Sequence, residues 1–537
     1  MATATSAAGW STLGGLEAIA RAAQAPAFVS SDRPQLEHGL QIGDVTADRA
    51  IVWSRADRAS ELVVEWDRSP DFSSPTVVRG SQARPTLDFT ARVDLQGLPA
   101  GEEIFLRTFF DATDSKRGKS EPLFGRFRTP PAGRRAIRFV WSGDTCGQGW
   151  GINPDLGGMT IYRTMLADNP DFFIHSGDNI YADAPLRPTV KLPDGSIWKN
   201  GFLDREPSKQ KVAQTLDEFR ACYRYNLCDE NMRAFNAEVP QIWQWDDHET
   251  VNNWYASKIL STDKRYGQKK VQALAARSNR AFLEYSPMRW HADGDRARIY
   301  RHIPYGSALD IFVIDTRSYR GPNSHNTQTA RTEETAFLAQ DQLRWLKEGL
   351  KSSTARWKII ASNTPLSLVI QDGKDGQGRP RYENVANGDG DPLGRELELA
   401  ELLSFMKENA IRDVVWLTGD VHYTAALEYH PNRAQFQDFD PFWEFVAGPL
   451  NAGTNGPRGL DNTFGPQVAF QNAARRGENN LPPTEGLQFY GQVDIEPDSQ
   501  DMVVTLKDLR GQALFSKRLS PSPGPRAATL PHRRRRT

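Results

Sequence analysis

Five short hydrophobic runs in this sequence each end at a polar residue of a type that binds metal ions. These residues are Asp144, Asp178, Asp247, Asn363 and Asp420, and each follows a run rich in Val, Ile, Phe or Trp. Such runs are typical of strands buried in a sheet, and ligands in open α/β sheets bind beyond the carboxyl ends of the strands. A single strand-end aspartate often caps the turn that follows it. Five ligand-type residues in such places predict one shared metal site.

Three further side chains follow these strand ends within a few residues. They are Tyr181, His248 and His422. Taken alone, Tyr181 is more often a core aromatic, and the alternative for His248 is a satisfied structural histidine. Their place beside the carboxylates adds a phenol and two imidazoles to the groups that the predicted site can use.

The elements that would position these residues alternate between strands and helices, and we assign residues 137–520 to this catalytic domain. The spacing of leucines predicts a helix over 393–410. The Gly- and Asp-rich stretch 371–394 is expected to be a long loop near the site, either a functional cover or disordered. Late strands over 489–495 and 502–506 are expected to form a hairpin that closes the second sheet.

The regions outside this domain have different patterns. Residues 37–130 show short strands separated by turn residues, which predict an all-β sandwich of immunoglobulin or fibronectin type, and 131–136 is a Pro- and Gly-containing linker. Residues 1–36 are an extension that either carries the remnant of an export signal or is a simple N-terminal addition. Residues 521–537 are expected to be a disordered basic tail that is either solvated or attracted to an anionic surface.

The bulk composition excludes several classes of protein. Charged residues make up 25% and hydrophobic residues 39% of the 537 residues, as in ordinary globular proteins. A formal net charge of −1 gives no reason to expect nucleic acid as a structural partner. We see no apolar run long enough for a transmembrane segment. Three cysteines form no disulfide framework, and nothing in the sequence indicates an oligomeric state.

The order of the polar residues resembles that of the calcineurin-like metallophosphoesterases, whose motifs run D, GD, GN-H-[ED], an H-x-P element and GHxH. This sequence has, in the same order, Asp144, Gly177-Asp178, Asp247-His248-Glu249, Asn363-Thr364-Pro365 and Gly419-Asp420-Val421-His422. Three ligand positions differ, because Asp247, Asn363 and Asp420 stand where that pattern has Asn, His and His.

These differences, with the WDDHE and IDTRSYR segments, are similar to the alkaline phosphatase D (PhoD-like) family. The resemblance covers nearly the whole chain, including the sandwich and the late FWEFVAGPLNAGT segment. It implies an α/β (α+β) double-sheet sandwich of calcineurin-like type, flanked by helices and preceded by the all-β domain. Many members have a cysteine at the first ligand position, where this chain has Asp144. Cys146, two residues later, is therefore an alternative ligand.

The resemblance implies a binuclear metal centre. Asp144, Asp178, Tyr181 and His422 would hold Fe³⁺, which suits a phenolate and carboxylates. Asp178 would bridge to a second ion, most simply Ca²⁺, held also by Asp247, Asn363 and Asp420. The second set offers only oxygen donors, which favour hard cations, so that Mn²⁺ or Mg²⁺ remains possible there.

The resemblance also implies roles in catalysis and substrate binding. Asp178 and His248 are expected to be catalytic, with His248 facing the phosphate, where it stabilises charge or protonates the leaving oxygen. Glu249 is expected to orient His248. Arg317 is expected to be catalytic and to clamp the phosphate, although an internal ion pair with Asp315 or another acid is equally consistent. Asn179 is expected to bind substrate, and Asn252 and Asn253 to support the ligands.

These inferences predict a metal-dependent phosphoric ester hydrolase that uses a binuclear metal-activated hydroxide on phosphodiesters or phosphomonoesters. The family resemblance implies a periplasmic or secreted protein exported by the twin-arginine route, with the signal incomplete in this sequence. Two alternatives stay open. One is a secreted metal-binding or adhesion protein without turnover, which would have a closed metal site. The other is a nuclease- or phospholipase-type phosphodiesterase, which as a nuclease would have basic and aromatic tracks beside the site.

Overall fold

The computed structural model describes residues 33–112, 118–291, 295, 297–388 and 390–523. The predicted export-signal remnant and the arginine-rich part of the predicted tail lie outside these residues. No helix formed by the described residues is long and apolar enough to cross a membrane.

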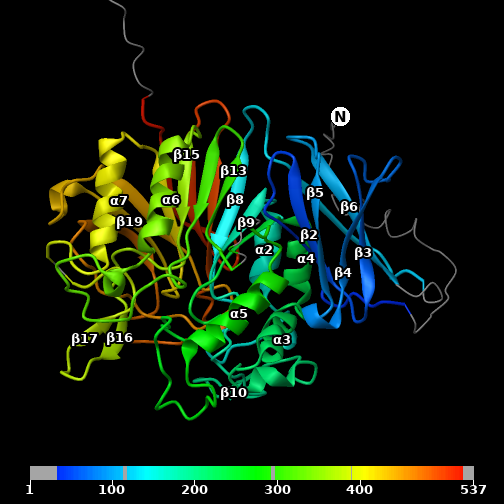
Figure 1. Ribbon diagram of the computed structural model, residues 1–537, viewed down its shortest axis with the longest axis horizontal. Coiled ribbons are helices and arrows are strands. Elements are labelled where there is room, and N and C mark those ends of the chain that lie inside the picture. The colour runs from blue at the N-terminus through cyan, green and yellow to red at the C-terminus, as the bar shows by residue number, and fades with distance from the viewer. Residues whose placement is uncertain (1–32, 113–117, 292–294, 296, 389, 524–537) are drawn as a thin grey trace, which may run out of the picture.

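The N-terminal strands form a β-sandwich (blue, right of Figure 1). One sheet has the order β1-β2-β5 and the other β4-β3-β6-β7. Alternate residues such as Val52, Leu62 and Leu106 point between the two sheets and form the core of the sandwich. The two-sheet arrangement agrees with the expectation, while its assignment to the immunoglobulin or fibronectin type stays a prediction. The strands are β1 (Leu40–Gly43), β2 (Arg49–Arg55), β3 (Ser60–Asp67), β4 (Thr76–Ala83), β5 (Thr90–Gln96), β6 (Glu103–Ala112) and β7 (Leu123–Arg128).

One sheet of the sandwich continues into the catalytic domain. Gly43 of β1 pairs in parallel with Gln241 of β12, so that β1-β2-β5 forms one end of a nine-stranded sheet. A Cβ atom at Gly43 would lie 2.7 Å from the carbonyl oxygen of Gln241 in β12 and 2.4 Å from that of Pro287, so the close approach of the backbone here requires glycine. A buried ion pair between Arg301 and Asp44, at 2.8 Å, joins the same two regions. The sandwich and the catalytic domain are therefore joined by backbone pairing as well as by the linker.

Two large sheets form the catalytic domain. The nine-stranded sheet has the order β24-β23-β22-β8-β9-β12-β1-β2-β5 and the seven-stranded sheet the order β13-β14-β15-β18-β20-β19-β21. The further strands of the first sheet are β8 (Ile137–Ser142), β9 (Phe172–Ser176), β12 (Gln241–Gln244), β22 (Phe489–Ile495), β23 (Met502–Asp508) and β24 (Ala513–Leu519). Those of the second sheet are β13 (Arg301–Tyr305), β14 (Leu309–Val313), β15 (Trp357–Ala361), β18 (Val414–Thr418), β19 (Thr424–Tyr429), β20 (Phe442–Val446) and β21 (Pro466–Asn472).

Successive residues of the central strands enter different hydrophobic layers. Trp141 of β8 and Ile359 of β15 pack together between the two sheets. Their neighbours Val140 and Ile360 point outward and pack against helices. Because both faces of each sheet are covered, these strands are mostly apolar, in agreement with the hydrophobic runs in the sequence.

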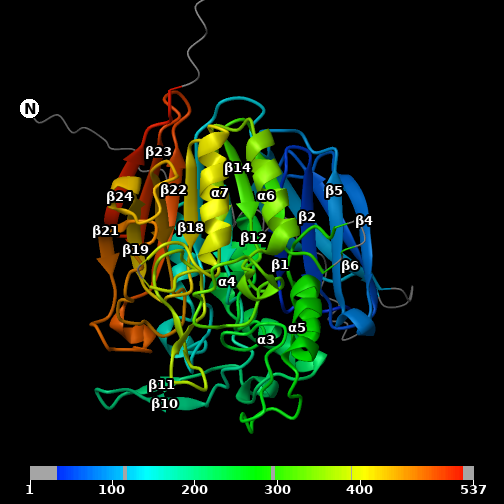
Figure 2. The ribbon, with the colours of Figure 1, turned by 60° about the vertical axis from the view of Figure 1, so that its left-hand side comes forward.

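Helices cover the outer face of each sheet. In Figure 2, α6 and α7 lie side by side in front of β14 and β18, and their leucines pack onto the seven-stranded sheet. The helices α2 to α5 pack against the nine-stranded sheet. The predicted double-sheet sandwich flanked by helices is thus observed, and the helix expected over 393–410 is α7. The helices are α2 (Thr160–Ala167), α3 (Leu216–Asn226), α4 (Glu230–Glu238), α5 (Val271–Tyr285), α6 (Ala339–Ser352) and α7 (Glu396–Glu408).

Two expectations about the fold are wrong. The late hairpin β22–β23 joins the first sheet, because β22 pairs antiparallel with β8. The two strands were expected correctly, but the alternation of residues does not indicate which sheet a strand joins.

The predicted long loop 371–394 contains a hairpin of β16 (Gln371–Lys374) and β17 (Pro380–Tyr382), in which the Asp375 carboxylate accepts hydrogen bonds from the turn backbone. A second small hairpin is formed by β10 (Thr189–Lys191) and β11 (Ile197–Lys199).

Candidate metal centre

The carboxyl ends of parallel strands from both sheets meet at one place. Asp144, Asp178 and Asp247 follow β8, β9 and β12 of the first sheet, and Asn363 and Asp420 follow β15 and β18 of the second. Among the described residues, three overlapping groups have ligand atoms within 4.8 Å of one another. They are Asp144, Asp178 and His422; Asp178, Asp247 and His248; and Asp246, Asp247 and Asp420. The structure therefore brings the predicted strand-end carboxylates together.

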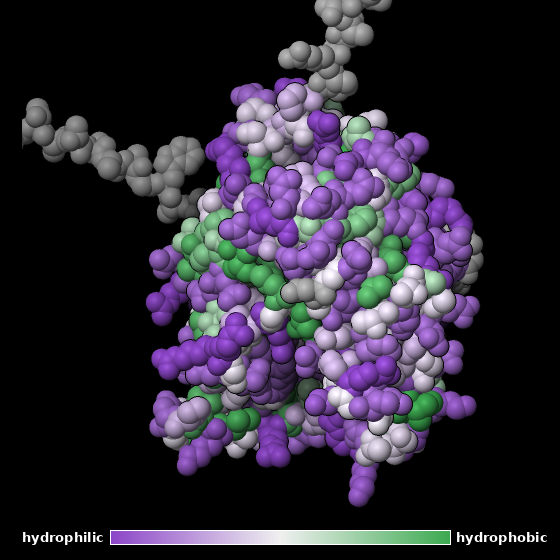
Figure 3. Space-filling model, turned by 90° about the vertical axis from the view of Figure 1, so that its left-hand side faces the viewer, coloured by the Kyte–Doolittle hydropathy of each residue, from purple (hydrophilic) through white to green (hydrophobic). Residues whose placement is uncertain are grey.

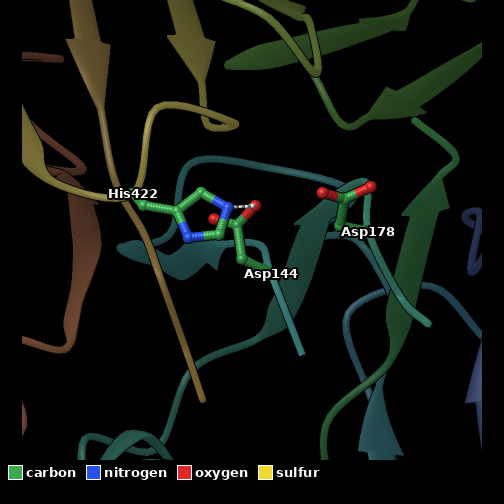
Figure 4. Close-up of side chains that lie close together, drawn as sticks. All are labelled: Asp144, Asp178 and His422. Carbon is green, nitrogen blue, oxygen red and sulfur yellow. Dashed lines mark ion pairs between the residues drawn. The ribbon is translucent and has the colours of Figure 1, made fainter. Parts of the chain in front are cut away.

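The first group surrounds the imidazole of His422. Its Nε2 lies 2.9 Å from the Tyr181 hydroxyl and 3.5 Å from Oδ1 of Asp144, toward which the ring points in Figure 4. Its Nδ1–H donates a hydrogen bond to the carbonyl oxygen of Gly453 at 2.5 Å, which leaves the Nε2 lone pair for the site. Burial lowers the pKa of His422 to about 4, so the ring is neutral, as a ligand must be.

Asp247, Asn363 and Asp420 offer oxygen donors whose orientation is set by hydrogen bonds. The Asn253 backbone N–H donates to Asp247, and the Thr364 hydroxyl donates to Asp420 at 3.3 Å. The Asn363 side-chain N–H donates to Asp246, which turns the amide oxygen of Asn363 away from that carboxylate. That oxygen accepts a hydrogen bond from Thr316 at 2.5 Å.

The backbone is strained where it presents these ligands. Asp144, Asp178, Asp420 and His422 have φ angles of 68°, 51°, 69° and 61°. Residues other than glycine seldom adopt this left-handed region, and such strain collects at functional sites. At Gly177, directly before Asp178, φ is 95° and a Cβ would lie 2.5 Å from Cβ of Asp246, so this turn requires glycine.

The site fits bound metal cations. One oxygen each of Asp144, Asp178 and Asp247 is buried without a hydrogen-bond partner. Burial raises the pKa values of Asp144, Asp178 and Asp420 well above the usual range, and the charges of nearby carboxylates raise them further. Buried carboxylates without a compensating charge cost free energy, and cations at this place would supply that charge.

His248 takes a different partner from the one expected. Its Nδ1 lies 2.7 Å from Oδ1 of Asp183, and its side chain is 12% exposed beside the metal ligands. Burial alone would lower the pKa of His248, but the charges of Asp183 and Asp247 raise it to about 10. Glu249 does not contact this ring. Its buried carboxylate accepts backbone N–H groups of Asp178 and Asp246, so it holds the two strand-end turns together.

Two residues expected to bind substrate point into the protein instead. Arg317 is fully buried, and its guanidinium pairs with Asp246 and Glu383. This is the internal ion pair that the sequence left open, and the expected phosphate clamp is not formed. Asn179 is 2% exposed, and its side-chain N–H donates to the carbonyl oxygen of Gln244 at 2.6 Å. Both side chains are held by partners far along the chain, which the local sequence does not reveal.

Cys146 belongs to the hydrophobic core. Its Sγ lies 3.4 Å from Sδ of Met159 and 3.8 Å from the side-chain nitrogen of Asn451. Burial raises the pKa of this thiol. The Asp144 carboxylate, and not this sulfur, lies beside His422.

A pocket of about 210 Å³ opens beside the centre. The sequence did not single out several of its residues, such as Gln148, Asn455 and Arg458, because they follow no strand end. Asp183 was also missed, although it lies only five residues after Asp178. The face in Figure 3 is mostly hydrophilic and has a deep hollow in its lower half. The residues that line the pocket are Gln148, Asp247, His248, Asn252, Asn253, Ile370, Gln371, Asp420, Val421, His422, Asn455 and Arg458.

Comparisons with known proteins give consistent results. A family model described as PhoD-like phosphatase matches residues 139–506, and one described as its N-terminal domain matches residues 21–131. Alkaline phosphatase D of Bacillus subtilis (strain 168) is 26% identical over 438 residues, which cover 78% of this chain and 70% of that protein.

Two solved structures share the fold. A structure of PhoD superposes with a TM-score of 0.64 and 22% identity over 93% of this chain and 94% of that one. The purple acid phosphatase PPD1 from yellow lupin seeds superposes with a TM-score of 0.56 and 12% identity over 92% of this chain and 75% of that one.

Proposed function

Because the chain belongs to the PhoD-like phosphatase family and is a metal-dependent phosphoesterase, we propose that it hydrolyses phosphate esters at a two-metal centre bridged by Asp178. The observation that carries this proposal is the meeting of five strand ends, which leaves buried carboxylate oxygens of Asp144, Asp178 and Asp247 without partners. Both phosphodiesters and phosphomonoesters are proposed as substrates.

The donor atoms divide between two metal positions. Asp144, Asp178, Tyr181 and His422 are proposed to hold Fe³⁺, because a phenol, an imidazole and carboxylates lie together there. The second position would be formed by Asp178, Asp247, Asn363 and Asp420, whose donors are all oxygen. Such a set suits Ca²⁺ and also accommodates Mn²⁺ or Mg²⁺.

Metal ions held at such a centre polarise the phosphoryl oxygens and lower the pKa of water. The residues of the chain supply orientation and a proton. Asp183 holds the imidazole of His248 by its Nδ1, which leaves Nε2 as the nitrogen that can face the leaving oxygen. With its raised pKa, His248 carries the proton that a departing alkoxide needs.

An open pocket favours an enzyme over a structural metal protein. Asp247, Asp420 and His422 line the cavity of about 210 Å³, so groups proposed as ligands border space that a substrate can enter. A structural metal site is normally closed on all sides by protein. By family resemblance we also propose that the protein works in the periplasm or outside the cell.

The test measures metals and hydrolysis in the same samples. Protein purified without added metal is analysed for its elements and assayed with p-nitrophenyl phosphate and bis-p-nitrophenyl phosphate. Activity is expected with both compounds. It should disappear after strong chelation and return when Ca²⁺ or another divalent ion is added. Metal-replete protein that hydrolyses neither compound at neutral to alkaline pH would contradict the proposal.

A further inference from the structure

Arg458 is a cationic residue of the substrate pocket that has no anionic partner within the described part of the chain. It lines the cavity together with Asp247, His248 and His422. No described carboxylate forms an ion pair with its guanidinium, and its Nε is buried without a hydrogen-bond partner. Arg317, by contrast, is paired with two buried carboxylates. The unpaired guanidinium therefore has its hydrogen-bond donors available to a ligand.

The backbone around Arg458 is held against the metal centre. The Asn455 N–H donates to the carbonyl oxygen of His422 at 3.1 Å, and the Arg458 N–H donates to the Tyr423 hydroxyl at 3.2 Å. Immediately after it, the carbonyl oxygen of Gly459 accepts the Val369 N–H at 2.9 Å. The backbone of Arg458 is thus held on both sides, and little ordering of the backbone is needed when a ligand binds.

Charge indicates what kind of ligand this is. A guanidinium that no described carboxylate neutralises is stabilised by an anion that binds beside it. Guanidinium groups bind phosphate oxygens with paired, charge-assisted hydrogen bonds. The pocket thus combines metal ligands with a cation that has no partner, and a phosphoryl group satisfies both.

We propose that Arg458 binds the non-bridging oxygens of the substrate's phosphoryl group and so favours esters whose phosphoryl group carries two negative charges. This inference rests on the proposed function and assigns to Arg458 the contact that the sequence suggested for Arg317. A phosphomonoester offers more free, charged oxygens to this arginine than a phosphodiester does. Arg458 is accordingly a residue that determines specificity between the two classes.

The test compares Arg458→Gln and Arg458→Lys with a matched control. Arg433→Gln is the control, because Arg433 pairs with Glu428 at 3.2 Å and does not line the pocket. Inorganic phosphate is titrated into each metal-loaded protein by calorimetry, and KM and kcat are measured with p-nitrophenyl phosphate and bis-p-nitrophenyl phosphate. Elemental analysis and thermal melting are done on the same samples.

Arg458→Gln is expected to weaken phosphate binding and raise KM for the monoester about 10- to 100-fold, the usual effect of losing a charged hydrogen bond. KM for the diester should rise at most about threefold, since the diester has fewer charged oxygens whose contact with the arginine is lost. For the monoester, KM of Arg458→Lys should lie between those of the wild type and Arg458→Gln, because lysine keeps the charge but loses the paired geometry. Arg433→Gln should match the wild type, and metal content should be the same throughout.

Several outcomes would overturn the inference. Unchanged phosphate affinity in Arg458→Gln would show that the arginine does not touch the anion. An equal rise in KM for both esters would contradict the charge preference. A loss of metal together with the loss of phosphate binding would show that Arg458 stabilises the metal centre and does not bind the substrate. A wild type that hydrolyses neither ester but binds phosphate through Arg458 would instead defeat the proposed function while supporting the anion contact.

Discussion

Nδ1 of His248 lies 2.7 Å from Oδ1 of Asp183, and this contact fixes which nitrogen of the ring can reach a substrate. The same carboxylate accepts the Asn252 backbone N–H through its other oxygen at 2.8 Å. Asp183 is thus held in place and in turn orients the ring. Glu249, the partner expected from the sequence, lies between the strand-end turns instead.

The first prediction concerns this contact. Asp183→Asn should lower kcat roughly 10- to 100-fold while metal content stays the same, because it acts on His248 and not on a ligand. Asp183 raises the pKa of His248, so its removal lowers that pKa. If protonated His248 is the acid, the alkaline limb of the kcat profile should move to lower pH. Asp194→Asn, in the turn between β10 and β11, is the control. An alkaline limb at the same pH in Asp183→Asn and the wild type would exclude this role of Asp183.

The second prediction separates a metal ligand from a residue that acts on the phosphate. Asp178→Asn should abolish activity and reduce the content of both metals, because the proposed bridge is lost. His248→Ala should lower turnover about 10²- to 10⁴-fold with metal content nearly intact. Activity and elemental analysis are measured together. If His248→Ala loses metal as completely as Asp178→Asn does, the roles are assigned wrongly.

The third prediction concerns colour. A phenolate bound to Fe³⁺ absorbs visible light, so concentrated protein should look pink to violet. Tyr181→Phe keeps the ring in its place beside His422 and His248 but removes the donor oxygen, so the colour should disappear. Cys146→Ser should keep the colour, since that thiol packs against Met159. Colour lost only in Cys146→Ser would reverse the assignment, and colourless, iron-free but active protein would indicate two divalent ions.

The fourth prediction tests a buried chain of charges that reaches a proposed ligand. Glu383 pairs with Arg317, Arg317 with Asp246, and Asp246 accepts from the amide of Asn363. Glu383→Gln should destabilise the fold by about 3–5 kcal/mol, because it leaves a buried charge without its partner. It should also weaken Ca²⁺ binding at the second position while the iron colour remains.

Glu348→Gln is the control for this chain, because Glu348 is exposed on α6. Stability is measured by urea denaturation, and Ca²⁺ affinity by titration of the chelated protein. A variant that loses stability but binds Ca²⁺ as the wild type does would show that the chain supports the fold and does not orient Asn363.

The sequence by itself determined the elements that carry the site. A strand covered on both faces is mostly apolar, so the hydrophobic runs that precede Asp144 and Asp420 are visible in the chain. The helix α7 was visible for a similar reason, since its leucines repeat with the period of a helix. These signals are local, which is why the strand ends and the helix could be predicted from the residues, whereas the double-sheet fold was implied by the family resemblance.

Only the tertiary structure decided the partners of the charged side chains. Arg317 lies 71 residues from Asp246 and 66 from Glu383 along the chain, and His248 lies 65 from Asp183. Whether an arginine faces a phosphate or a buried carboxylate depends on how two sheets pack, because long side chains reach whichever anion packing places near them. The same packing left Arg458 at the pocket without a carboxylate, and no pattern in its neighbouring residues indicates this.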